Sequence, residues 1–149
     1  MATVNGGKLV VDALKREGVE YIFSLSGGHI NPIYEACSQA DIKVIDTRHE
    51  QAAAHMAEAW GRLTLKPGVC VVTAGPGFTD SITGIANAYM AASPMLIISG
   101  RSGVAETETL ALQELEQIEI IRPLVKWTQV VYETKRIDEF VAMAYRHAM

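Results

Sequence analysis

Short and almost uninterrupted apolar runs alternate along this chain with segments of helical periodicity, and this alternation constrains the fold most. The apolar runs are Tyr21–Leu25, Ile42–Asp46, Val69–Thr73, Met95–Ser99 and Trp127–Tyr132. The helical patterns are Gly7–Arg16, Asn31–Ser38, Glu50–Leu63, Thr79–Ala91 and Ile137–His147. Strands covered by helices on both faces need no polar alternation, and β–α alternation is typical of parallel sheets. We therefore predict an α/β domain with a mostly parallel sheet of five or six strands and helices on both faces.

The length and charge of the chain restrict the classes of protein to which it can belong. A chain of 149 residues, 49% of them hydrophobic, can form one domain with a single core and is too apolar to be disordered. Its formal net charge is −4, with acids and bases interspersed, which argues against nucleic acid and against membrane binding. Asp80 is the only charge from Pro67 to Gly100, but glycine, proline, serine and threonine interrupt this stretch, so it is not a membrane span.

The two cysteines, Cys37 and Cys70, have neither the spacing of a metal site nor that of a disulfide framework. Both lie in apolar segments, where a free core thiol is the simplest interpretation. No signal peptide is seen at the amino terminus. We therefore expect a reduced, cytoplasmic location.

Glu50 directly follows the second apolar run and opens a helical pattern, in the string His49-Glu50-Gln51. A strand-to-helix turn lies at the carboxyl edge of a parallel sheet, where open α/β folds bind their ligands. A carboxyl group at this place is either a solvated acid at a helix start or an acid/base group of a site. The residues alone leave both interpretations open.

Two glycine-rich loops also follow strands directly, Ser26–His29 and Ala74–Thr79. Glycine allows sharp turns and close approach of a ligand to the backbone. Neither loop has the pattern of a P-loop or of a dinucleotide-binding turn. Each alone is most simply a strand-to-helix connection, but two of them at the same sheet edge as Glu50 predict a pocket.

Three other polar residues have ordinary explanations when they are considered one at a time. His29 fits a turn residue near a helix start, and Gln113 fits a surface position. Asp80 fits the first turn of a helix, where the helix dipole favours negative charge. His29 and Gln113 acquire a further interpretation only from the combination of motifs.

Together, these residues resemble the pyrimidine-binding domain of thiamine-diphosphate enzymes, a group that includes acetolactate synthase, benzoylformate decarboxylase, oxalyl-CoA decarboxylase and benzaldehyde lyase. The likeness covers residues 1–149, and His-Glu followed by Gly-Pro-Gly at this spacing is specific to the group. The matching segments are Gly6–Val10, Gly18–Glu20, Asp46–Glu50, Thr73–Gly77, Ile85–Ala88, Leu112-Gln113 and Lys126-Trp127. The strings around His29, His49 and Phe78 look most like benzaldehyde lyase.

The resemblance implies a role for each matching site residue. Glu50 would hydrogen bond to the pyrimidine of thiamine diphosphate and assist the proton transfer that activates it. His29 and Gln113 match positions that face substrate, so the implied catalytic set is Glu50, His29 and Gln113. The implied cofactor-binding positions are Glu50, Thr73, Gly75, Pro76 and Gly77. The implied activity is that of a lyase or carboligase acting on 2-hydroxy ketones, aldehydes or 2-oxo acids.

The chain departs from the pattern of the group in three ways. Asp80 stands where the group usually has asparagine. The Gly-Asp-Gly…Asn motif that holds the diphosphate and Mg²⁺ is absent, so we expect no metal ligand here and no activity from the chain alone. The glycine-rich turn and last strand of such domains are also absent. The resemblance therefore implies a diphosphate-binding domain as partner, on the same or another chain.

Two rival functions and one assembly follow from these considerations. The first alternative to a domain of a lyase or carboligase is the small subunit of a two-subunit 2-oxo acid decarboxylase. The second is a non-catalytic assembly or regulatory module of the same fold. Glu50 argues against the module, because an assembly surface does not need this acid. Small residues on the helices after Glu50 and Thr79 predict a homodimer through these helices.

Overall fold

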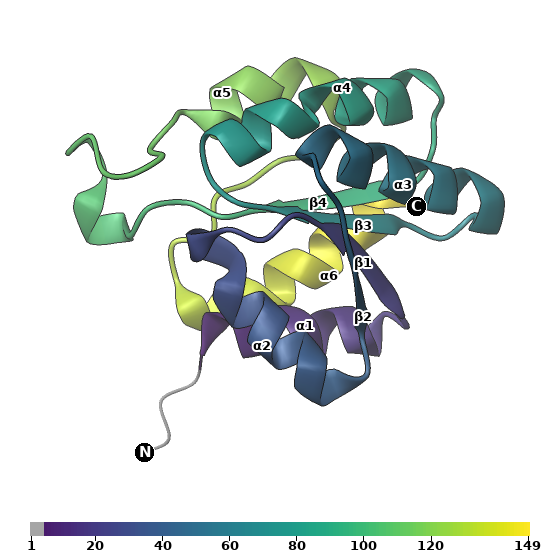
Figure 1. The fold of residues 1–149 in the computed structure, drawn as a ribbon, viewed down its shortest axis with the longest axis horizontal. Helices are drawn as coiled ribbons and strands as arrows, with labels where there is room; N and C mark the ends of the chain where they lie inside the picture. Colours follow the sequence, from purple (N-terminus) through teal and green to yellow (C-terminus); the bar gives the residue numbers. More distant parts are fainter. Residues whose placement is uncertain (1–4) are drawn as a thin grey trace.

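The computed structural model describes residues 5–149. It has a four-stranded parallel sheet that lies between two layers of helices (Figure 1). The strands are β1 (Tyr21–Ser24), β2 (Lys43–Asp46), β3 (Gly68–Val72) and β4 (Met95–Ser99), in the order β2-β1-β3-β4. The helices are α1 (Gly6–Arg16), α2 (Asn31–Ala40), α3 (Glu50–Thr64), α4 (Pro76–Met90), α5 (Gln117–Ile121) and α6 (Ile137–Ala148). Short 3₁₀ turns, η1 (Gly28–Ile30), η2 (Val104–Glu106), η3 (Arg122–Leu124) and η4 (Thr134–Arg136), join them.

The two faces of the sheet carry separate hydrophobic cores. Helices α1, α2 and α6 cover one face, and α3, α4 and α5 cover the other (Figure 1). Strand β3 lies in the middle of both cores and is buried along its whole length. Cys37 and Cys70 are buried free thiols, one in each core, as the sequence predicts. Within residues 5–149, no helix is long and apolar enough to cross a bilayer.

Helices α3 and α4 pack closely against each other because small residues line their contact. A side chain at Gly84 of α4 would place its Cβ 2.5 Å from the Cβ of Ala54 on α3. Ala53 and Ala57 of α3 and Ala88 of α4 are also buried. Ala53, Ala57 and Ala88, which the sequence placed in a dimer interface, therefore belong to the interior of the domain, whereas Ala52, Ala59, Ala91 and Ala92 from the same prediction are exposed.

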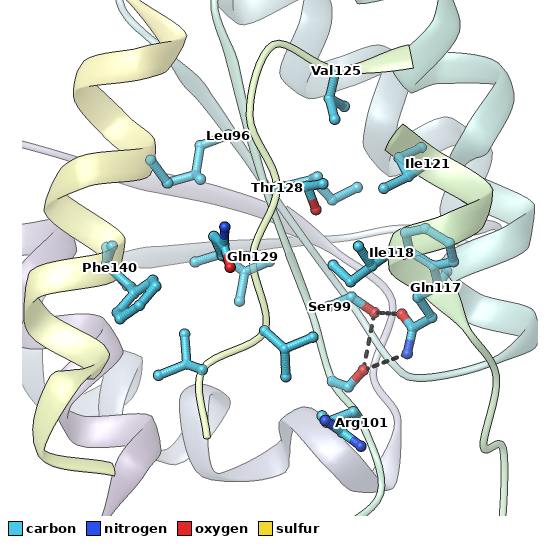
Figure 2. Close-up of a pocket in the computed structure, with 18 of the residues that line it drawn as sticks. Leu96, Ser99, Arg101, Gln117, Ile118, Ile121, Val125, Thr128, Gln129 and Phe140 are labelled. Carbon is cyan, nitrogen blue, oxygen red and sulfur yellow. Dashed lines mark hydrogen bonds between the residues drawn. The ribbon is translucent and has the colours of Figure 1, made fainter. Parts of the chain in front are cut away.

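The prediction of a fifth strand at Trp127–Tyr132 is wrong for this structure. Residues 125–132 form no ladder, and the described part of the chain contains four strands rather than five or six. A cavity of about 1010 Å³ lies beside β4 and is also lined by this segment (Figure 2). The segment has the composition of a strand, but it is paired with none of the four strands of the sheet.

The helices also differ from the prediction at the start of α4 and by the presence of α5. Helix α4 begins at Pro76 rather than at Thr79, because proline suits the first turn of a helix, where its missing N–H is not needed. The short helix α5 was not predicted, since five residues are too few to show a periodicity. The start of α3 at Glu50 is confirmed.

Candidate functional site

Glu50 opens α3 at the carboxyl edge of the sheet, and polar contacts of the His49 and Thr47 side chains hold the turn before it. The Nδ1 atom of His49 accepts from the backbone N–H of Gln51 at 3.1 Å and caps the helix. The hydroxyl of Thr47 reaches the carbonyl oxygens of Ser24 at 3.2 Å and of His49 at 3.0 Å. The turn between β2 and α3 is thereby tied to the end of β1.

The loop after β3 lies against the carboxyl group of Glu50. Gly75 has φ 62° and ψ −115°, a conformation that side chains strongly disfavour. A Cβ at Gly77 would lie 3.0 Å from Glu50 Oε1 and 2.6 Å from Thr73 Cγ2. The strand order therefore places Glu50 and Gly75-Pro76-Gly77 at one edge, the arrangement expected from the sequence.

The Glu50 side chain is almost buried, since the residue is 9% exposed. It also lies close to the core, because its carboxylate adds to the rise that burial produces in the pKa of the Cys70 thiol. None of the side-chain hydrogen bonds described for residues 5–149 involves this carboxyl group, and its oxygens are not among the fully buried atoms that lack a partner. A nearly buried carboxyl group without such a partner can accept a polar ligand group at low cost in desolvation.

His49, Glu50 and Asp80 bring one possible ligand atom each within 4.8 Å of one another. His49 and Asp80 are exposed, and His49 already uses Nδ1 to cap α3. Exposed acids in such groups are common without a metal ion. We therefore assign no metal to these three residues.

His29, Thr73 and Gln113 form a second polar group on the other side of the glycine loop. The Nδ1 atom of His29 lies 3.3 Å from the hydroxyl oxygen of Thr73, and this hydroxyl donates to Gln113 Oε1 at 3.4 Å. Gln113 has φ 61°, which is uncommon for a residue with a side chain. A Cβ at Gly75 would lie 2.8 Å from the carbonyl oxygen of Gln113, so the loop that contains Gln113 folds back onto the crevice.

Two features of this edge were missed in the sequence. A Cβ at Gly100 would lie 2.5 Å from the Cβ of His29, so this glycine makes room for the histidine. Its position directly after an apolar strand was the available signal. Gln117 accepts from the Ser99 hydroxyl at 2.5 Å and donates to the Gly100 carbonyl at 3.0 Å (Figure 2). No sequence pattern marks this contact, because it joins β4 to a helix that periodicity does not reveal.

Residues 4–120 match the family described as thiamine pyrophosphate enzyme, N-terminal TPP binding domain. The chain therefore belongs to this family, and its fold is the α/β fold expected from the resemblance. The described residues include Glu50, the glycine loop and the group around Thr73, all of which lie within the matched range.

Named relatives add two kinds of enzyme to this finding. The chain is 44% identical over 144 residues to 2-hydroxyacyl-CoA lyase 2 of Caenorhabditis elegans, which covers 97% of the chain and 22% of the relative. It is 41% identical over 140 residues to the protein of the same name from Danio rerio, with 94% and 22% covered. It is 35% identical over 147 residues to an acetolactate synthase large subunit of Mycobacterium tuberculosis, with 99% and 27% covered.

The chain thus spans about a quarter of the length of these relatives. The particular likeness to benzaldehyde lyase stays a prediction, since these relatives carry other names.

Proposed function

We propose that this chain is the cofactor-activating domain of a thiamine-diphosphate-dependent lyase or carboligase. The observation that carries the proposal is the Glu50 carboxyl, which is nearly buried and lies beside the glycine loop. The glycine loop brings bare backbone close to this acid, because a Cβ at Gly77 would lie only 3.0 Å from Glu50 Oε1, and glycine allows a ligand to approach the backbone closely. These residues therefore fit the pyrimidine part of the cofactor.

Bound thiamine diphosphate would supply a carbon nucleophile and an electron sink, chemistry that no protein side chain offers. In this proposal, Glu50 holds and passes a proton at the pyrimidine ring. Thr73 and Gly75-Pro76-Gly77 form the wall against the ring. His29 and Gln113 lie past Thr73 and face substrate.

The proposed substrates are 2-hydroxy ketones, aldehydes, 2-oxo acids or their 2-hydroxyacyl relatives. The names of the relatives support this class, since one kind is a 2-hydroxyacyl-CoA lyase and the other an acetolactate synthase. Both names denote chemistry at a carbon–carbon bond beside an oxygen-bearing carbon. This common chemistry is the activity that we propose for the complete protein.

We propose that the diphosphate and Mg²⁺ bind to another domain, because the sequence has no Gly-Asp-Gly…Asn motif. The exposed outer surface of α3 and α4 supports contact with another subunit. Met90 is 82% exposed and Leu63 is 83% exposed, and Met56 and Tyr89 are also open to solvent. Large exposed apolar side chains are typical of interfaces when they form a patch.

We also propose that a further strand of the complete protein pairs with β4. The two edge strands of the sheet, β2 and β4, differ in polarity. Strand β2 carries exposed Lys43 and Asp46, whereas β4 has the apolar sequence Met95-Leu96-Ile97-Ile98-Ser99. Charge protects an edge from pairing, and a run that is apolar on both faces is typical of an interior strand. The cavity beside β4 is lined by apolar side chains that include Leu96, Ile118 and Phe140 (Figure 2). Amide hydrogen exchange tests this proposal, since β4 amides should be far better protected in the complete protein than in residues 1–149 alone.

Replacement of Glu50 by glutamine in the complete enzyme tests the main proposal. The amide keeps the size of the side chain but cannot hold or pass the proton, so turnover should fall by about 10²–10⁴-fold while the fold is kept. Glu20→Gln is the matched control, because Glu20 is exposed and precedes β1 at the opposite edge of the sheet. Near-normal turnover of Glu50→Gln would show that cofactor activation does not use this acid.

A further inference from the structure

The Thr73 side chain is fixed at the centre of the crevice by its neighbours. The residue is 6% exposed and directly follows β3. A Cβ at Gly27 would lie 2.4 Å from Thr73 Cβ, and one at Gly77 would lie 2.6 Å from Thr73 Cγ2. Backbone on both sides therefore holds the carbon atoms of the side chain, and the hydroxyl reaches His29 and Gln113.

The hydroxyl of threonine has a single proton, so it can donate only one hydrogen bond. In the structure it donates to Gln113 Oε1, an atom that cannot itself donate. When the hydroxyl proton is used for Gln113, the contact of 3.3 Å between Thr73 Oγ1 and His29 Nδ1 is donated by the histidine, from an imidazole that is protonated on Nδ1. In a neutral imidazole with its proton on Nδ1, the other nitrogen, Nε2, is free to accept a proton.

We propose that Thr73 is a positioning residue, which through Gln113 holds His29 in the tautomer that is protonated on Nδ1. His29 then presents an unprotonated Nε2 as a proton acceptor. Gln113 contributes by accepting at Oε1, and its left-handed backbone and its contact with Gly75 hold its Cα and Cβ against the glycine loop. The tautomer is inferred from these contacts, whereas its use in catalysis rests on the proposed function.

In the proposed reaction, His29 Nε2 takes the proton of a substrate hydroxyl. The imidazole becomes an imidazolium that still donates from Nδ1 to Thr73, and the proton returns when the product is protonated. Thr73 itself gains and loses no proton in this sequence. Without the hydroxyl, nothing among these three residues would select one nitrogen of His29.

The test uses the complete protein with ¹⁵N-labelled histidine and a Thr73→Val variant, which has nearly the same shape and no hydroxyl. Nitrogen chemical shifts at pH 8.5, assigned to His29 by comparison with His29→Ala, report which nitrogen carries the proton. We expect Nδ1–H in the wild-type protein and loss of this preference in Thr73→Val. Thr73→Ser keeps the hydroxyl and should restore it.

Turnover provides the second readout. Thr73→Val should lower kcat by about tenfold to 100-fold, up to the lower end of what a general base contributes. Because Thr73 acts through His29, the same change in a His29→Ala background should cause no further loss in kcat. The KM for thiamine diphosphate separates this effect from damage to the cofactor wall, and it should change little.

An Nε2–H signal in the wild-type protein, or an unchanged Nδ1–H signal in Thr73→Val, would overturn the inference whatever the activity. If His29→Ala is fully active while the wild-type and Thr73→Val proteins show the expected nitrogen shifts, the proposed role of His29 in catalysis is contradicted. The inference on Thr73 then still stands. The two failures are therefore distinguishable.

Discussion

Replacement of Gly75 by alanine is the most direct test of how the turn after β3 shapes the crevice. Gly75 has φ 62° and ψ −115°, and its ψ lies outside the left-handed helical region that other residues tolerate. The added Cβ would also lie 2.8 Å from the carbonyl oxygen of Gln113 and 3.1 Å from its Cα. Because these atoms belong to backbone, they can give way only if the loop moves.

Gly18 offers a matched control for the strain alone. It has φ 76°, but a Cβ at this position meets no atom within 4 Å. Gly18→Ala should therefore cost only the left-handed strain of about 1–2 kcal/mol. Gly75→Ala should cost about 3 kcal/mol or more, at or above the upper end for a strained backbone position.

Thermal unfolding of the 149-residue chain, followed by circular dichroism, measures both costs. At about 2–4 °C per kcal/mol for a chain of this size, Gly18→Ala should lower Tm by about 2–8 °C and Gly75→Ala by about 6–12 °C. In the complete enzyme, Gly75→Ala should also lower turnover, whereas Gly18→Ala should not. Equal Tm shifts together with normal turnover of Gly75→Ala would refute the proposed function of this turn.

Three further predictions concern other parts of the domain. Burial alone would raise the pKa of the Glu58 carboxyl, but hydrogen bonds from Ser93 at 2.7 Å and from Arg62 lower it overall. Because the pKa of Glu58 is lower in the folded state, the stability gained from its ionised carboxylate is present above the pKa of the unfolded chain and is lost as the pH falls through the folded pKa. Ser93→Ala should therefore lower the free energy of unfolding, measured in urea, by about 1.5–3 kcal/mol at pH 7 and by much less at pH 3. Burial raises the pKa of the Cys37 thiol to about 11 and that of Cys70 as well, so both thiols should resist alkylation at pH 8 until the chain unfolds; fast labelling of the native protein would contradict their burial. Met90→Glu should reduce self-association measured by light scattering, while Asp80→Asn, on the same helix, should not; an unchanged mass for Met90→Glu would remove this residue from the interface.

Much of the fold follows from local features of the chain. The four strands that were predicted correctly are short apolar runs between glycine, proline and polar residues, and each meets a neighbour in the sheet. The start of α3 follows from His49, which caps it, and from the alanine-rich run that comes after. The incorrect strand, Trp127–Tyr132, has an equally suitable composition. Its state depends on whether a partner strand is present, which composition does not reveal.

The candidate site depends on both kinds of information. Glu50 and Gly75-Pro76-Gly77 could be placed at one edge because each follows a parallel strand, and the carboxyl ends of parallel strands share an edge. Gln113 could not be placed in this way, since it lies in a turn far from any predicted strand. Gly100 was missed because glycine is required at this position only by the close approach of His29, which the sequence does not show.

The order of residues by itself determined the α/β class, the parallel direction of the strands and the family, because periodicity and motif spacing are local properties of the chain. The tertiary structure decided which helices pack on which face, that the alanines of α3 serve its contact with α4, and that Thr73 joins His29 to Gln113. The contacts of Thr73 with His29 and with Gln113 link residues that are 44 and 40 positions apart. Their geometry is set by how the packed elements close on one another, and no local pattern in the sequence encodes it.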